Sequence, residues 1–155
     1  MIAALIALQL GAVTLPYSGL QYCYVTRDPG CIRETFTPED LALINLEVTE
    51  AITTVENDDY YDPWTPFPAD RRGDCDDDAA TKRAALLGQG FDPKAMHFET
   101  GYVDGQPHIV LVVTLNGKDW VMDRKTPDRV YVTSKRPYQW QPMAREGRRV
   151  QWEVK

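Results

Sequence analysis

The sequence predicts an α+β fold in which helices come first and an antiparallel sheet follows. Apolar residues recur at three- and four-residue spacing from about residue 38 to about residue 54, which is typical of an amphipathic helix. A second helix is predicted to begin after Asp74 and to end at Gly88 and Gly90. Beyond residue 96 the apolar period changes to two, which is typical of strands. This order of elements is that of an α+β domain.

Length and charge narrow the class of protein. A chain of 155 residues with 43% hydrophobic residues is long enough to bury the core of one domain. Its 23 acidic residues exceed its 17 basic ones, which argues against nucleic acid or an anionic membrane surface as the main partner. We therefore expect one domain over residues 22–155, preceded by an apolar segment over residues 1–21.

The apolar segment itself has two interpretations. Residues 1–13 have about the length of the apolar part of a signal peptide and are too few to span a bilayer, so no stable membrane insertion is expected. Because no Lys or Arg precedes Arg27, the positive start of a signal peptide is missing. A signal remnant and a packed N-terminal segment both remain open.

The three cysteines divide into two plus one. Cys23 and Cys31 bracket a short loop that contains Pro29-Gly30, whereas Cys75 stands far away in the chain. This spacing indicates one disulfide and one free thiol, and a disulfide indicates an oxidising compartment. The alternative is a pair of unbridged thiols in a cytosolic protein.

The first predicted helix has a clear start, and a proline-rich segment follows it. Thr37 can cap the helix, Pro38 suits the first helical position, and Asp40 completes a capping box. Residues 57–68 contain three prolines and several aromatic residues, Trp64 among them. We expect an ordered loop here that lies over the start of the second helix.

Cys75 is placed at the N-terminus of that second helix, directly after the capping residue Asp74. The aligned peptide dipoles favour a thiolate at this position. The aspartates at 76, 77 and 78 oppose it, since like charges beside a sulfur disfavour its ionisation. Cys75 is therefore either a buried structural cysteine at an acidic helix start, or a nucleophile whose neighbours are offset by a cation or a histidinium.

A hairpin is predicted from residue 108 to residue 123. His108 to Leu115 is apolar on both faces and so reads as a central strand, and Asn116-Gly117 is a strong two-residue turn signal. Residues 118–123 then form the partner strand, residues 131–133 a further short strand, and residues 150–154 a last edge strand. Trp140 and Trp152 are expected to fasten the tail to the sheet.

The hairpin register brings His108 and Asp123 together. If Leu115 faces Lys118 across the turn, Asp123 is the diagonal neighbour of His108 on the same face of the sheet. An aspartate that holds one imidazole nitrogen is the orienting half of a catalytic triad. Taken singly, His108 could instead be a core histidine and Asp123 the cap of the next turn. His97, which alternates with Met96 and Phe98, is expected at the surface.

Three blocks in this order resemble a known family. They are Gly73-Asp74-Cys75-Asp76-Asp77-Asp78-Ala79, His108-Ile109-Val110-Leu111 and Val121-Met122-Asp123. They are similar to the Gly-Asp-Cys-Glu-Asp-Tyr-Ala, His-Ala-Val-Leu and Leu-Asp-Asn blocks of the bacterial transglutaminase-like cysteine peptidases. The similarity extends upstream to the two-cysteine loop, the helix around Asn45 and the Asp62-Pro63-Trp64 stretch.

The resemblance implies a papain-like, transglutaminase-type fold with Cys75 as nucleophile, His108 as general base and acid, and Asp123 as the residue that orients the histidine. It also implies calcium binding through Asp74 and Asp76, and an oxyanion hole or substrate groove to which the Trp64 loop contributes. Members of the family are mostly exported bacterial proteases, so a periplasmic or secreted protein with a protein substrate is expected. A protein regulator is a possible further partner.

Three residues depart from the family pattern: Asp76 replaces a glutamate, Asp78 a tyrosine and Arg124 an asparagine. The sequence thus predicts a calcium-assisted cysteine endopeptidase. Two other hypotheses remain, namely acyl transfer to an amine by a transglutaminase or amidase, and a non-catalytic calcium-dependent protein-binding module. A zinc site is disfavoured because the spacing supplies no further ligands to Cys75 and His108.

Overall fold

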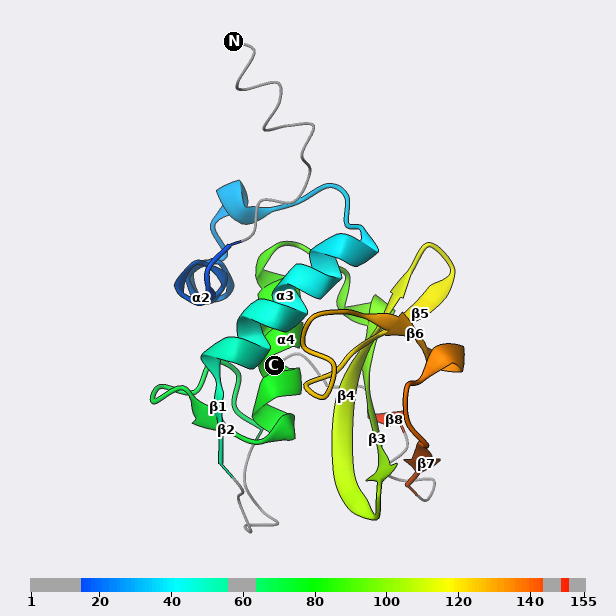
Figure 1. Cartoon of the computed structure of the whole chain (residues 1–155). Helices are drawn as coiled ribbons and strands as arrows, with labels where there is room; N and C mark the ends of the chain where they lie inside the picture. The colour runs from blue at the N-terminus through cyan, green and yellow to red at the C-terminus, as the bar shows by residue number, and fades with distance from the viewer. Residues whose placement is uncertain (1–14, 56–63, 144–148, 151–155) are drawn as a thin grey trace.

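The computed structural model describes residues 15–55, 64–143 and 149–150. In Figure 1 the helices gather on one side of the molecule and an antiparallel sheet forms the other. Helix α4 (Cys75–Gly88) lies between them, since it packs against helix α2 (Tyr17–Thr26), helix α3 (Pro38–Ala51) and strand β4 (Gln106–Leu115). The predicted α+β fold is confirmed.

The capping signals place both main helices. Thr37 and Asp40 form the predicted capping box of α3, with Pro38 at the first position. The helix ends at Ala51, earlier than the predicted residue 54, because Thr53 and Thr54 are extended and pair as strand β1 with Arg72 and Gly73 of β2. Helix α2 was not anticipated by the sequence analysis; it crosses position 21, where the apolar segment was expected to end.

The sheet has the strand order β6-β5-β4-β3-β7, and β8 also pairs with β3. Its remaining strands are β3 (Met96–Val103), β5 (Lys118–Met122), β6 (Tyr131–Val132), β7 (Gln141–Pro142) and β8 (Arg149–Val150). Leu115 faces Lys118, so the predicted hairpin register is confirmed. Val150, the first residue of the predicted last strand over 150–154, lies in β8; the rest of that prediction and the role of Trp152 fall on residues 151–155, outside the described residues.

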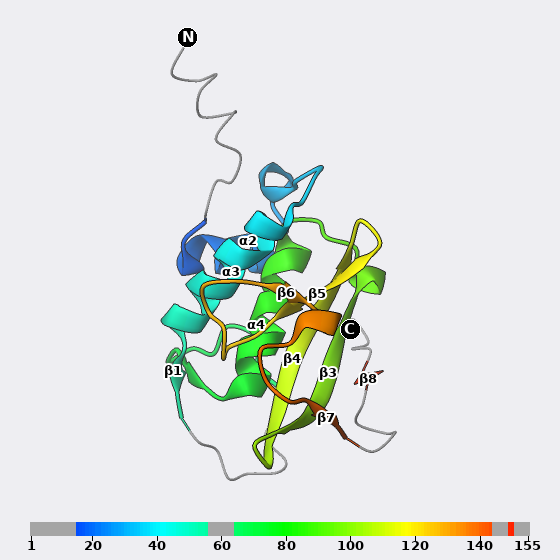
Figure 2. The same cartoon turned by 45° about the vertical axis from the view of Figure 1, so that its right-hand side comes forward.

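The two faces of the sheet contribute to two separate hydrophobic clusters. Ile109, Leu111 and Val113 of β4 join the main core, which they share with the helices. Val110 and Val112 face the opposite way and form a smaller cluster with Tyr131, against which Trp140 packs. Figure 2 shows the C-terminal segment running across this second face. Trp140 therefore fastens the tail to the sheet, as predicted.

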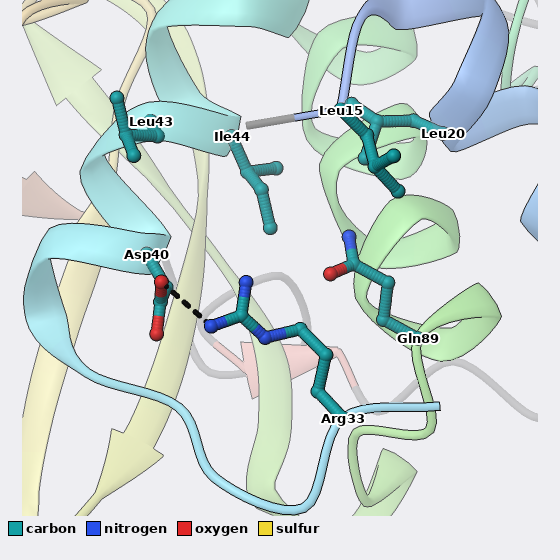
Figure 3. A pocket seen from close by; sticks show the side chains of 7 residues that line it. All are labelled: Leu15, Leu20, Arg33, Asp40, Leu43, Ile44 and Gln89. Carbon is teal, nitrogen blue, oxygen red and sulfur yellow. Dashed lines mark ion pairs between the residues drawn. The ribbon is translucent and has the colours of Figure 1, made fainter. Parts of the chain in front are cut away.

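The disulfide and a small pocket lie at the far end of α4 from Cys75. Cys23 and Cys31 are bridged, which leaves Cys75 as the free thiol of the chain. Nearby, Arg33 reaches Asp40 at 2.9 Å across a pocket of about 10 Å³ (Figure 3). A space of this size holds about one water molecule, so it is not a substrate site. Among the described residues no helix is long and apolar enough to cross a membrane.

Candidate active site

Cys75 occupies the first position of α4, and its neighbours lock that helix start in place. The Asp74 carboxylate accepts from the amides of Asp76 and Asp77, and the Asp77 carboxylate in turn accepts from the Asp74 amide at 3.3 Å. Gly73 permits this arrangement, since a Cβ at that position would lie 2.6 Å from an Asp77 oxygen. The sulfur is therefore held at a rigid helix start.

The sulfur of Cys75 lies beside strand β4. It accepts from the backbone N–H of Ile109, the residue that follows His108, and the thiol also contacts an Asp76 carboxylate oxygen at 3.7 Å. The packing of α4 against β4 thus places the Cys75 sulfur at Ile109, the residue that follows His108 in β4. The structure brings these two predicted residues to the same end of the sheet.

Electrostatics at the sulfur favour the protonated thiol. Burial is the largest cause, and the Asp76 carboxylate adds to it, so that the pKa of Cys75 rises to about 12 in spite of the Ile109 amide. The aspartates raise the pKa as expected from the sequence, and burial, which the sequence did not indicate, adds the largest effect. A nucleophile at this position would need a base to remove its proton as it reacts.

His108 and Asp123 are hydrogen-bonded, as the register predicted. The distance from His108 Nε2 to Asp123 Oδ1 is 2.8 Å, and both side chains are buried. Because an ionised carboxylate only accepts hydrogen bonds, Nε2 carries the proton and the lone pair of the neutral imidazole lies on Nδ1. The aspartate thus fixes the tautomer in which Nδ1 can accept a proton from a thiol.

Asp123 is itself surrounded by donors. The Lys125 amide donates to Oδ1 at 2.9 Å, the Tyr131 hydroxyl donates to Oδ2 at 2.9 Å, and the Tyr138 hydroxyl also donates to Oδ2. Burial acts to raise the pKa of Asp123, but the bonds from His108, Tyr138 and the Lys125 amide outweigh it and lower the pKa to about 2. Asp123 also caps the following turn through the Lys125 amide, so the predicted capping contact occurs together with the bond to His108.

Two further groups hold this arrangement from outside. Asn45 of α3 is buried and donates to the Thr126 carbonyl at 2.9 Å and to the Asp123 carbonyl at 3.3 Å, which anchors the loop after β5. Trp140 lies edge-on to His108 with ring centroids 6.3 Å apart, and it fits over Gly101, where a Cβ would come within 2.6 Å of the indole. The histidine is therefore packed as well as hydrogen-bonded.

The sequence profile of the bacterial transglutaminase-like cysteine proteinases matches residues 17–154. The chain belongs to this family. No curated protein sequence matches the chain.

Solved structures agree with the transglutaminase-like fold of the family. Calcium-bound LapG of Legionella pneumophila superposes with a TM-score of 0.61 at 17% identity, covering 83% of this chain and 82% of LapG. EGTA-treated LapG gives 0.60 at 17% identity, with coverages of 84% and 81%. A putative cysteine protease from Cytophaga hutchinsonii gives 0.52 at 14% identity, and the match covers 77% of this chain and 44% of that one. At these identities the likeness establishes the fold.

Asp74 and Asp76 are the residues that the sequence predicts as calcium ligands. Carboxylates are suitable ligands for calcium, which takes six to eight oxygens. Within residues 15–55 and 64–143, however, no three acidic, histidine or cysteine side chains gather in a way that could hold a metal. One Asp74 oxygen caps the helix, and Asp76 faces the thiol. Asp74 and Asp76 alone supply fewer oxygens than a calcium ion takes, so a calcium site here would need further ligands.

Trp64 packs on the flank of α4. Its ring meets Phe98 edge-on with centroids 5.1 Å apart, and it lines a small pocket with Ala80 and Ala84, which follow Cys75 on the same helix. The loop is tied to α4, since the Thr65 amide donates to Asp77 at 2.9 Å and the Phe67 amide donates to the Thr81 hydroxyl at 2.8 Å. The loop therefore covers the first turns of the helix, as predicted for the described part of it. A role of Trp64 in an oxyanion hole or groove stays a prediction.

One expectation about this region was wrong. His97 does point away from the main core, but it is not at the surface, since only 11% of its side chain is exposed and its Nε2 lies 3.7 Å from Glu99. The tail residue Arg136, which pairs with Glu99 at 2.7 Å and stacks on Trp140, covers this face. Sequence alternation gives the face of a strand but not what later covers that face.

The low pKa of Asp123 predicts acid sensitivity. Its unfolded value is 3.8 and its folded value about 2, so its contribution to stability is fully present above about pH 5 and is lost as the pH falls through 4 towards 2. By this linkage, the free energy of unfolding of wild type relative to Asp123→Asn should fall by about 2 kcal/mol between pH 5 and pH 2. Urea titrations of both proteins across this range measure it. A difference that stays constant with pH would contradict the assignment.

Proposed function

We propose that the protein is a cysteine endopeptidase that hydrolyses peptide bonds of a protein substrate, with Cys75, His108 and Asp123 as its catalytic triad. The observation that carries the proposal is the buried bond between His108 Nε2 and Asp123 Oδ1, adjacent to the Ile109 amide that donates to the Cys75 sulfur. Membership of the cysteine proteinase family agrees with it.

In the proposed reaction, the Cys75 sulfur attacks a peptide carbonyl while its proton passes to Nδ1 of His108. The imidazolium that results is stabilised by Asp123, which stays ionised because its pKa is low. His108 then gives the proton to the leaving amine, the peptide bond breaks, and a thioester remains on Cys75. Water, deprotonated by His108, attacks this acyl-enzyme and releases the acid. Backbone amides near Cys75, together with the Trp64 loop, are proposed to bind the oxyanion.

Product analysis tests the proposal against acyl transfer to an amine. The protein is incubated with a denatured bacterial proteome and a biotin-labelled primary amine, and both new N-termini and biotin incorporation are measured by mass spectrometry. New N-termini without incorporation are expected. Incorporation without cleavage would replace the peptidase by a transglutaminase, and neither product would point to a non-catalytic binding module. The same run with a Cys75→Ala protein identifies cleavage by contaminants.

Calcium dependence and an oxidising location are further parts of the proposal. The disulfide between Cys23 and Cys31 supports a periplasmic or secreted protein. Calcium would offset the negative charge of the aspartates near Cys75. Iodoacetamide should therefore alkylate Cys75, the free thiol of the chain, faster in calcium than in EGTA. Alkylation rates from pH 5 to pH 10 in both buffers measure this, and superimposable curves would remove calcium from the proposal.

A further inference from the structure

A buried group of charged residues lies behind the proposed triad, between α4 and the end of β5. Lys82 has no exposed surface and forms an ion pair with Asp78, one turn earlier on α4. Asp78 also pairs with Arg124 at 3.5 Å. Arg124 directly follows Asp123 in the chain, and Asp78 lies three residues after Cys75 on the helix. The pair of Asp78 and Arg124 thus connects the segment that carries the nucleophile to the segment that carries the aspartate.

Arg124 makes contacts on its other side as well. Its Nη2 donates to the Ile52 carbonyl at 2.9 Å and to the Thr54 hydroxyl, at the end of α3 and in β1. Asp78 in turn lies 3.5 Å from the Thr49 hydroxyl of α3. One guanidinium therefore joins α4, α3, β1 and the end of β5. The planar fork of an arginine can make such contacts in fixed directions, which a lysine cannot do.

The charges of this group are matched. Asp78 and Asp123 are negative and Lys82 and Arg124 are positive, so the group is neutral when Asp123 is ionised. Burial lowers the pKa of Lys82, whereas Asp78 and Asp123 both act to raise it, which agrees with mutual compensation of these charges. Removing one member would leave an uncompensated buried charge beside Asp123.

We infer that Asp78 and Arg124 act as a pair of positioning residues that sets the placement of Cys75 relative to the His108–Asp123 pair. The inference rests on the proposed function and deepens it. Neither residue touches the substrate in this view; both act through the segments that they join. Because a misplacement of about 1 Å can cost about a hundredfold in rate, the loss of such a pair should lower the rate of the chemical step more than substrate binding.

A double-mutant cycle tests the inference on a peptide that the wild type cleaves. Arg124→Gln and Asp78→Asn should each lower kcat about tenfold or more with KM within about twofold, and the double variant should be no slower than the slower single variant. Arg124→Lys, which keeps the charge, should recover part of the loss. Lys118→Gln, which removes a positive charge from the exposed start of β5, is the matched control and should behave as wild type.

Stability is measured in parallel, because a structural ion pair would lower the thermal midpoint alone. Unchanged kcat in folded Arg124→Gln, or losses that multiply in the double variant, would overturn the inference. If Asp78→Asn does not fold, Arg124→Gln and Arg124→Lys still decide by their kcat and KM values. If the wild type cleaves nothing, the proposed function fails separately. The rate of Cys75 alkylation then replaces kcat in the same cycle. His108→Ala serves as the reference, because in this variant the histidine can no longer activate the thiol.

Discussion

Replacing Cys75 with alanine is expected to abolish peptide hydrolysis and to leave the fold nearly unchanged. The sulfur is the atom that would form the acyl-enzyme, and no other free thiol exists to replace it. Loss of a nucleophile in a comparable serine protease triad lowers kcat on the order of 10⁶-fold, which takes the rate to the limit of most assays. The helix start is retained, because its capping bonds come from Asp74 and Asp77.

The measurement is the appearance of new N-termini with time, for wild type and variant at equal concentration. Far-ultraviolet circular dichroism and the thermal midpoint serve as the control for folding, and both should agree closely with wild type since Cys75 contributes only a partly buried thiol. Turnover by a folded Cys75→Ala protein at more than a trace of the wild-type rate would rule out the covalent mechanism.

Replacing Asp123 with alanine is expected to lower kcat by about 10³ to 10⁴-fold, by analogy with the loss of the orienting aspartate in a serine protease triad. Without the carboxylate, nothing holds the His108 proton on Nε2 and nothing compensates the imidazolium. KM should change little, because Asp123 is fully buried and does not reach the substrate. The fold will lose stability too, since four donors lose their acceptor.

Kinetics below the melting temperature of the variant separate the two effects, and Tyr138→Phe provides a graded comparison. This change removes one of the two hydroxyls on Oδ2 but keeps the carboxylate and the bond to His108. Its kcat should therefore fall only a few-fold. An Asp123→Ala protein that is folded and within tenfold of wild type would mean that His108 is oriented by another group.

Local signals predicted the central part of the site. The Asn116-Gly117 turn fixes the register, and the register places His108 near Asp123 without knowledge of any other part of the fold. Asp74 and Asp77 cap α4 by contacts within four residues, so the position of Cys75 also follows from short-range chemistry. Helix caps and two-residue turns have standard geometries and characteristic residues, and they involve residues close in the chain. They can therefore be predicted from a short stretch of sequence.

Contacts that depend on tertiary packing could not be predicted in the same way. Tyr131 lies on the two-residue strand β6 and Tyr138 on the irregular segment that follows, and only the folded structure shows that both hydroxyls meet Asp123. Lys82 follows an acidic helix start and would be expected in solvent, yet it is fully buried because Asp78 and the charges across the helix interface compensate it. The raised pKa of Cys75 could not be predicted either, because its largest cause is burial, which no local sequence pattern specifies.

Tyr138, whose hydroxyl donates to Asp123, comes later in the chain than the segments that carry Cys75, His108 and Asp123. The residues of α4 and β4 leave the ribosome long before residue 138, so a nascent chain carries its nucleophile before the hydroxyls on the aspartate are available. A chain terminated shortly after β6 would retain Cys75, His108 and Asp123 and yet lack both Tyr138 and the Trp140 ring beside the histidine. In the proposed peptidase, full activity would thus require the chain to be made at least as far as Trp140.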